Sequence, residues 1–185
     1  FEMSPTLDDA AFAGRWRQRE QPNQRRVALQ MRLPPGDSDL GVLRRTVAEI
    51  TEGATMTASE FSRRAGDWLR KQHTYSLSPT LPGGDGDPLV RWLASREAGH
   101  CELFAGSLVL LARTAGFPAR VVTGFRGGSW NAFSNNFTIR NSEAHAWTEI
   151  FDEVAGAWLR SDSLVATSAV QGEEVRGAAA MASRL

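Results

Sequence analysis

The chain has 185 residues, 42% hydrophobic and 23% charged, which excludes wholesale disorder and collagen-like repeats. Its 21 basic and 21 acidic residues give no net charge, so we expect no nucleic-acid partner, which would require a basic excess. The single cysteine, Cys101, excludes an intramolecular disulfide and a multi-cysteine zinc site. The longest nearly apolar stretch, residues 103–112, is shorter than the roughly 20 residues that span a bilayer, so we expect no direct membrane insertion of this chain.

The first 60 residues are expected to form an arm, a strand and a helix. Residues 1–24 are polar and predict an arm with a short helix around 8–16. Apolar side chains alternate over residues 25–33, which predicts a half-buried strand. An apolar stripe at spacings of three and four predicts a helix from Asp39 to about Glu52, capped by Ser38.

Four further segments before residue 119 carry local signals. Thr57 and Glu60 form a capping box that opens a second helix. Residues 74–77 are extended and lead into a loop over 78–86. Asp87 then caps a short helix, and a longer helix opens at Cys101.

The hydrophobic period changes to two after residue 119. Four strands are predicted, at residues 120–125, 136–141, 145–151 and 157–163. The tail, 166–185, is predicted to be a docked helix or a frayed end. Helices followed by an antiparallel run of strands predict an α+β fold, with a sheet covered by helices on one side.

Cys101 is a candidate nucleophile because of its place in the chain. At the start of a helix, backbone N–H groups and the helix dipole favour negative charge, and the thiolate is the nucleophilic form of cysteine. The alternative is a structural, buried cysteine. The polar neighbours His100 and Glu102 argue against a fully apolar site.

His145 and Asp162 are candidates for the base and the orienting acid. On a strand, His145 shares a face with Trp147, and the small residues on either side of it leave room for a partner. A short turn predicts that residues 149/150 pair with about 159, so Asp162 lies near the start of the His145 strand. From there the Asp162 carboxylate can accept a hydrogen bond from the His145 imidazole and fix its tautomer. Taken singly, each is more often an ordinary structural residue.

The segments 99–105 (GHCELFA), 112–124 (ARTAGFPARVVTG), 143–149 (EAHAWTE) and 158–162 (WLRSD) resemble the transglutaminase-like domain, a branch of the papain-like cysteine enzymes. The resemblance is closest to the bacterial transglutaminase/protease A type and covers about residues 65–168. One departure is Ser163-Leu164, where the family has Pro-Thr after the aspartate.

The resemblance implies a papain-like, transglutaminase-like core in which a cysteine-bearing helix packs on an antiparallel sheet. It implies Cys101 as nucleophile, His145 as base and Asp162 as orienting group, without metal or cofactor. In that superfamily a side chain before the cysteine helix supplies an oxyanion donor, and Tyr75 is the candidate. Trp130 and Trp147 are candidates for lining the cleft. Trp130 is equally explained as a surface-packed residue, and Tyr75 as an amphipathic residue packed at a core edge.

From this we expect three parts: residues 1–60 of uncertain role, a catalytic core over 61–168, and a tail over 169–185. The expected activity is thiol-dependent acyl transfer on amide bonds of a peptide or protein, by transamidation or hydrolysis. The alternatives are an N-acetyltransferase or amidase with the same triad, and an idle domain that binds peptide or cell-wall material. The resemblance also implies a periplasmic or other extracytoplasmic domain, tethered to transmembrane segments of a longer protein.

Overall fold

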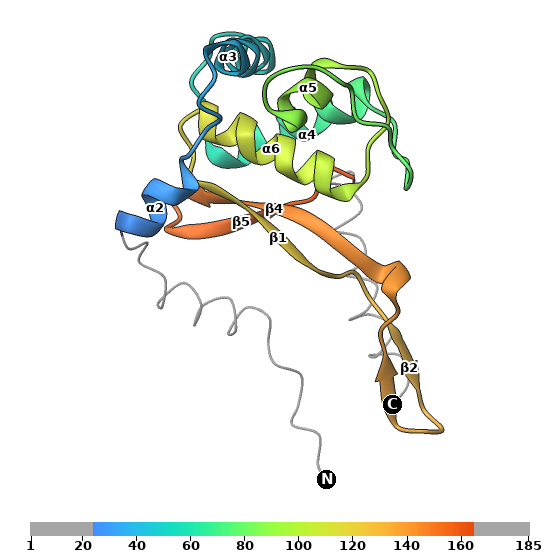
Figure 1. Cartoon of the computed structure of the whole chain (residues 1–185). Helices are drawn as coiled ribbons and strands as arrows, with labels where there is room; N and C mark the ends of the chain where they lie inside the picture. The colour runs from blue at the N-terminus through green and yellow to red at the C-terminus, as the bar shows by residue number, and fades with distance from the viewer. Residues whose placement is uncertain (1–23, 165–185) are drawn as a thin grey trace.

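A computed structural model describes residues 24–164 of the chain, with helices on one face of an antiparallel sheet (Figure 1). The helices are α2 (Gln24–Gln30), α3 (Asp37–Thr51), α4 (Ala58–Gln72), α5 (Pro88–Ala94) and α6 (Cys101–Thr114). The strands are β1 (Ala119–Phe125), β2 (Ser129–Asn131), β3 (Asn136–Thr138), β4 (Ala144–Asp152) and β5 (Ala157–Ser161), with a 3₁₀ turn at Asn141–Glu143. The predicted α+β class, with a cysteine-bearing helix on the sheet, is confirmed.

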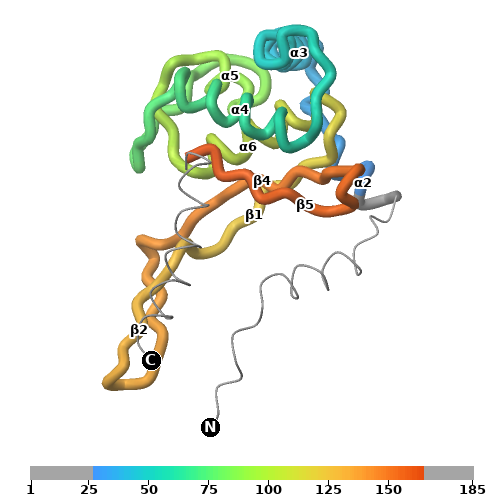
Figure 2. Tube along the Cα trace, turned by 180° about the vertical axis from the view of Figure 1, so that it is seen from behind, coloured from blue at the N-terminus to red at the C-terminus, as the bar shows by residue number. Residues whose placement is uncertain are grey.

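The main sheet has the order β1-β4-β5, so β4 pairs on both sides. The β4–β5 register pairs Ile150 with Leu159, as the short turn predicts. The β1–β4 register pairs Gly124 with His145. Between β1 and β4 the chain forms the separate β2–β3 hairpin, which projects away from the body in both views (Figures 1 and 2).

One hydrophobic core lies between the helices and the sheet. Helix α6 is buried along most of its length, because its sequence is apolar nearly all round. The α3 residues Leu43 and Ile50 belong to the same core. Helix α3, which lies within residues 1–60, therefore packs against the expected catalytic core over 61–168. Ile150 contributes from the centre of β4.

Local capping signals account for most helix starts. Thr57 Oγ1 accepts from the Glu60 N–H at 3.2 Å, as the capping box predicts. Asp87 Oδ1 accepts from the first N–H groups of α5, and Pro88 occupies the first turn. In α3 the predicted cap is wrong: the helix begins at Asp37 after Gly36, and Ser38 lies inside it. Asp39 is instead buried and accepts from the Asp87 N–H at 2.9 Å, which ties α3 to α5.

The predicted strand over 25–33 is also wrong, because helix α2 occupies Gln24–Gln30. The apolar alternation there is too short to exclude a helix, and most residues of the segment are good helix formers. Val27 and Met31, one turn apart, are the half-buried pair, whereas Leu29 is half exposed. The strand predicted at 136–141 ends at Thr138, and β2 was not predicted.

The expected arm over 1–24, apart from Gln24, and the expected tail over 166–185 lie outside the described residues. Within residues 24–164, no helix has the length and apolar character needed to cross a membrane.

Candidate active site

Cys101 is the first residue of α6, where the sequence predicts it. The cap is His100, whose Nδ1 accepts from the Glu102 N–H at 3.2 Å. The next two N–H groups of the helix donate to the His100 carbonyl. Among residues 24–164 the Cys101 N–H and thiol have no hydrogen-bond partner, and the side chain is half-buried. This N–H therefore remains available to a ligand beside the sulfur.

The segment that leads into Cys101 is fixed by an aromatic stack. Trp92 stacks on His73, with ring centroids 4.0 Å apart, and its indole N–H donates to the Ala98 carbonyl at 3.0 Å. Gly99 passes over the indole so closely that a Cβ there would lie 2.4 Å from Trp92 Cζ2. Only glycine fits this close approach.

A buried hydrogen bond fixes α6 on β4. Thr148 Oγ1 donates to the Ala105 carbonyl at 2.8 Å, and both residues are buried. Ala105 lies one turn after Cys101 on the same helix face, and Thr148 lies three residues after His145 on β4. Helix and strand both begin at the same end of the molecule (Figure 1), so Cys101 and His145 lie at that common end.

His145 is joined to Asp162 as the register predicts. Its Nε2 lies 2.7 Å from Asp162 Oδ2, and the side chains are only 8% and 9% exposed. A carboxylate can only accept, so Nε2 carries the proton, and in the neutral ring Nδ1 has the lone pair. Among residues 24–164 Nδ1 has no hydrogen-bond partner. Such an imidazole can take a proton at Nδ1.

Asp162 is held by bonds on both sides of it. Its Oδ1 accepts from the Leu164 N–H at 3.2 Å, so the Ser163-Leu164 departure still leaves a turn that orients the carboxylate. Ser161 Oγ accepts from Ser62 Oγ at 2.6 Å, and the Ser163 carbonyl accepts from Arg70 at 2.9 Å. Helix α4 therefore fixes both neighbours of the acid.

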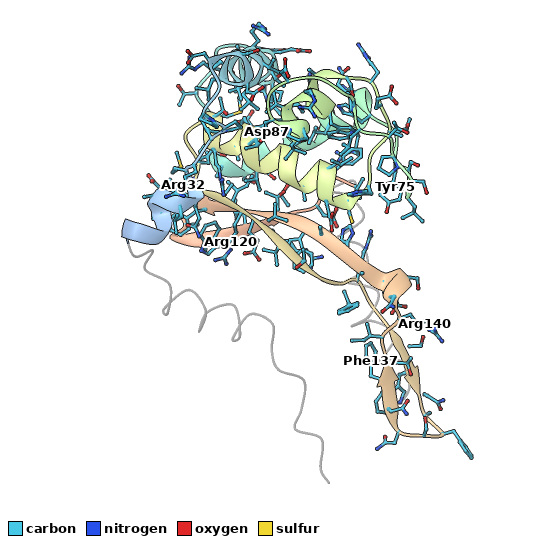
Figure 3. All side chains as sticks on the ribbon, viewed as in Figure 1. Arg32, Tyr75, Asp87, Arg120, Phe137 and Arg140 are labelled. Carbon is cyan, nitrogen blue, oxygen red and sulfur yellow. The ribbon has the colours of Figure 1, made fainter. Side chains whose placement is uncertain are left out.

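Tyr75 lies near the start of α6 (Figure 3), and the backbone around it forms a bridge with Gly99. The Ser76 N–H donates to the Gly99 carbonyl at 2.8 Å, and the Gly99 N–H donates to the Thr74 carbonyl at 2.9 Å. Partial burial, and then the charge of Cys101, raise the pKa of the Tyr75 phenol. The phenol is half exposed. Its oxyanion role stays a prediction.

The two candidate tryptophans lie in different places. Trp147 stacks beside His145, with ring centroids 6.4 Å apart, and the Arg160 guanidinium lies 4.4 Å from its centroid. Trp130 lies on the projecting hairpin, opposite Phe137. Their cleft-lining roles stay predictions.

Sequence reasoning missed several positioning residues. Thr148 gave the signal of a polar side chain on the buried face of an amphipathic strand, since Ala146 and Ile150 flank it there. The His73–Trp92 stack left no signal in the sequence, because the two residues are distant along the chain and meet only in the fold. Within the described part of the chain, no group of three His, Cys, Asp or Glu side chains is placed to hold a metal ion.

The sequence model of the transglutaminase-like superfamily matches residues 44–163. The chain belongs to this superfamily. A protein-glutamine gamma-glutamyltransferase of Pseudomonas aeruginosa is 38% identical over 88 residues, which are 48% of this chain and 13% of that protein. The uncharacterized YebA protein of Bacillus subtilis is 33% identical over 76 residues, which are 39% of this chain and 10% of that protein.

Two solved structures share the fold of this transglutaminase-like chain. The periplasmic domain of TgpA from Pseudomonas aeruginosa matches with a TM-score of 0.65 and 25% identity, over 78% of this chain and 48% of that chain. A candidate cysteine protease from Cytophaga hutchinsonii matches with a TM-score of 0.51 and 20% identity, over 74% of this chain and 41% of that chain. The chain thus spans about half or less of each of these structures and a small part of the curated relatives.

Proposed function

We propose that this chain is a cysteine-dependent acyltransferase acting on amide bonds of a peptide or protein. Cys101 is the nucleophile, His145 the base and Asp162 the orienting acid. The observation that carries the proposal is the buried hydrogen bond between His145 Nε2 and Asp162 Oδ2, at the end of the sheet where α6 begins with Cys101. The names of the relatives, a glutamine acyltransferase and a candidate cysteine protease, support the same chemistry.

The first half of the reaction forms a thioester. The Cys101 thiol gives its proton to His145 Nδ1, and the sulfur attacks the amide carbonyl. The Cys101 N–H, unpaired among residues 24–164, donates to the oxyanion, with the Tyr75 hydroxyl as a second donor. His145 then gives the proton to the leaving amine as the C–N bond breaks.

The second half of the reaction resolves the thioester and regenerates the free Cys101 thiol. His145 takes a proton from water or an amine, which attacks the thioester carbonyl and forms the new C–O or C–N bond. The C–S bond breaks, and the proton passes to the Cys101 sulfur. Throughout, Asp162 keeps Nε2 protonated and stabilises the imidazolium.

The triad is tested by alkylation of Cys101 with iodoacetamide across pH, read by intact mass. A free thiol ionises near pH 8.5, so a rate that stays high well below this value indicates an activated pair. We expect His145→Ala and Asp162→Asn to lower this rate at neutral pH. Asp152→Asn is the matched control, since Asp152 only caps the β4–β5 turn through the N–H groups of Val154 and Ala155. A wild-type rate that titrates like a free thiol and ignores both triad variants refutes the proposal and favours an idle binding domain.

The acyl donor is tested separately. A glutamine-containing peptide is expected to release ammonia, and an added primary amine distinguishes transamidation from hydrolysis. Turnover of small acyl donors alone would instead favour an N-acetyltransferase or amidase. Because the TgpA domains that match this chain are periplasmic, we also propose an extracytoplasmic location, tethered to membrane segments of a longer protein.

A further inference from the structure

The exposed apolar side chains of this molecule are concentrated in one short stretch of the chain. Eleven large hydrophobic residues of the described chain are exposed, and six of them lie within residues 121–139. These six are Val121, Phe125, Trp130, Phe133, Phe137 and Ile139. The last four lie on the β2–β3 hairpin or directly beside it, so this small projecting element carries four of the eleven exposed residues.

The hairpin presents its aromatic rings in a defined arrangement. Trp130 and Phe137 are cross-strand partners and therefore lie on one face. Asn131 Oδ1 accepts from the N–H groups of Phe133 and Ser134, at 3.0 and 3.2 Å, which fixes the turn. Phe133, at this turn, is fully exposed at 101%. The hairpin that carries these three exposed rings projects from the body of the molecule (Figures 1 and 2).

Arginines outnumber acidic residues at the base of the hairpin, where Glu143, directly after the stretch, accepts from the Arg140 N–H through its carboxylate at 3.0 Å. Residues 121–142 contain no Asp, Glu or Lys, and their two charged residues are Arg126 and Arg140. Both arginines lie at the base of the hairpin, away from the turn that carries Phe133 (Arg140 in Figure 3). Aromatic rings at the tip with cations behind them match a lipid interface, where rings enter the headgroup region and arginines meet anionic phosphates.

We propose that the β2–β3 hairpin docks on the surface of a bilayer that contains anionic lipid. A protein partner must match the shape of about 800 Å² on each side, whereas a bilayer accepts a projecting tip of any shape. The expectation of no membrane insertion drawn from the sequence concerned spanning segments, and a tip in the headgroup region is a different contact. Neither the triad nor any acyl transfer enters the argument, so this proposal and the proposed function fail independently.

The test is flotation of the full 185-residue chain with vesicles of phosphatidylcholine alone and of equimolar phosphatidylcholine and phosphatidylglycerol. The wild-type chain is expected to float with the anionic vesicles. Replacing both Trp130 and Phe133 by Ser is expected to weaken binding by about tenfold or more, since each ring leaves water on docking. The Arg126→Gln and Arg140→Gln variants should each bind the anionic vesicles about fivefold more weakly than the wild type, with no change on vesicles of phosphatidylcholine alone.

The matched control is Val154→Ser, which removes an equally exposed apolar side chain from the β4–β5 turn. It is expected to float like the wild type. The proposal is overturned if the wild-type chain floats with neither vesicle, if the Trp130/Phe133 variant binds like the wild type, or if Val154→Ser loses as much. In the first case a protein partner becomes the occupant to test.

A second readout follows Trp130 itself. Brominated lipids quench tryptophan fluorescence on contact, and part of the quenching should disappear in Trp130→Phe. Equal quenching in both chains would place the membrane contact elsewhere and reject the hairpin.

Discussion

Glycine at position 124 is required so that Trp147 can lie beside His145. Gly124 pairs with His145 across β1 and β4, and the Trp147 ring extends over the space that a side chain would occupy. The Cβ of Gly124→Ala would lie 2.9 Å from Cη2 and 3.2 Å from Cζ3 of Trp147. Carbon atoms in contact lie roughly 3.5–4.0 Å apart, so the indole must retreat by about 0.5–1 Å.

The retreat is costly because the indole has neighbours. Arg160 lies 4.4 Å from the ring centroid, the His145 ring lies 6.4 Å away, and the indole Nε1 is buried. Overpacking of this kind costs about 1–3 kcal/mol of stability. A displacement of about 1 Å at a catalytic group lowers its rate by up to ~100-fold. We therefore expect Gly124→Ala to lower Cys101 alkylation at neutral pH by about tenfold or more while the chain stays folded.

The assay is the iodoacetamide rate together with urea unfolding, for the wild-type chain and four variants. Gly83→Ala is the control, because a Cβ there meets nothing within 4 Å. Trp147→Phe removes the two ring atoms that the new Cβ would strike, so it should rescue Gly124→Ala in the double variant. Wild-type reactivity in a folded Gly124→Ala chain, or losses that simply add in the double variant, would refute this reasoning.

Three further results are expected. Tyr75→Phe should lower kcat on an amide substrate by about 100-fold, with KM and the iodoacetamide rate retained; a change of less than twofold would leave Tyr75 as a packing residue. Burial lowers the pKa of His73 from its ordinary value of 6.5, so the unfolded chain binds more protons below that pH. The free energy of unfolding should therefore fall as pH falls below 6.5, by at most about 1.4 kcal/mol per unit, and a His73→Phe chain with the same slope in urea titrations would contradict this. Thr148→Val removes the buried hydrogen bond to Ala105 and should lower the free energy of unfolding by about 1–3 kcal/mol. Thr123→Val, at an exposed position of β1, should change it little. Equal losses of the two variants in urea unfolding would contradict a stabilising role of the Thr148–Ala105 bond.

The elements that the sequence predicts well carry local signals. Thr57 and Asp87 cap helices through bonds that reach only two or three residues along the chain. The β4–β5 register follows from a short turn, and with it the place of Asp162 beside His145. A triad candidate on three such elements is therefore readable from the chain itself.

The elements that the sequence predicts poorly depend on distant partners. The α2 segment alternates over too few residues to separate a strand from a helix. Ser38 is a good cap by type, but Asp39 is drawn inward by the Asp87 N–H, 48 residues away, and the helix starts earlier. The support of Cys101 by the stack of Trp92 and His73 likewise exists only after the chain has folded.

The contacts between α4 and the segment around β5 couple the assembly of the proposed triad to the completion of folding. The bonds from Ser62 to Ser161 and from Arg70 to Ser163 close loops of 99 and 93 residues, among the slowest contacts of such a chain to form. Asp162 lies between the two closing points, so it reaches His145 only when the last strand docks on one of the first helices. During synthesis or refolding, therefore, the proposed triad is incomplete until these long-range contacts have formed. The proposed triad is thus completed at the same moment as the native topology.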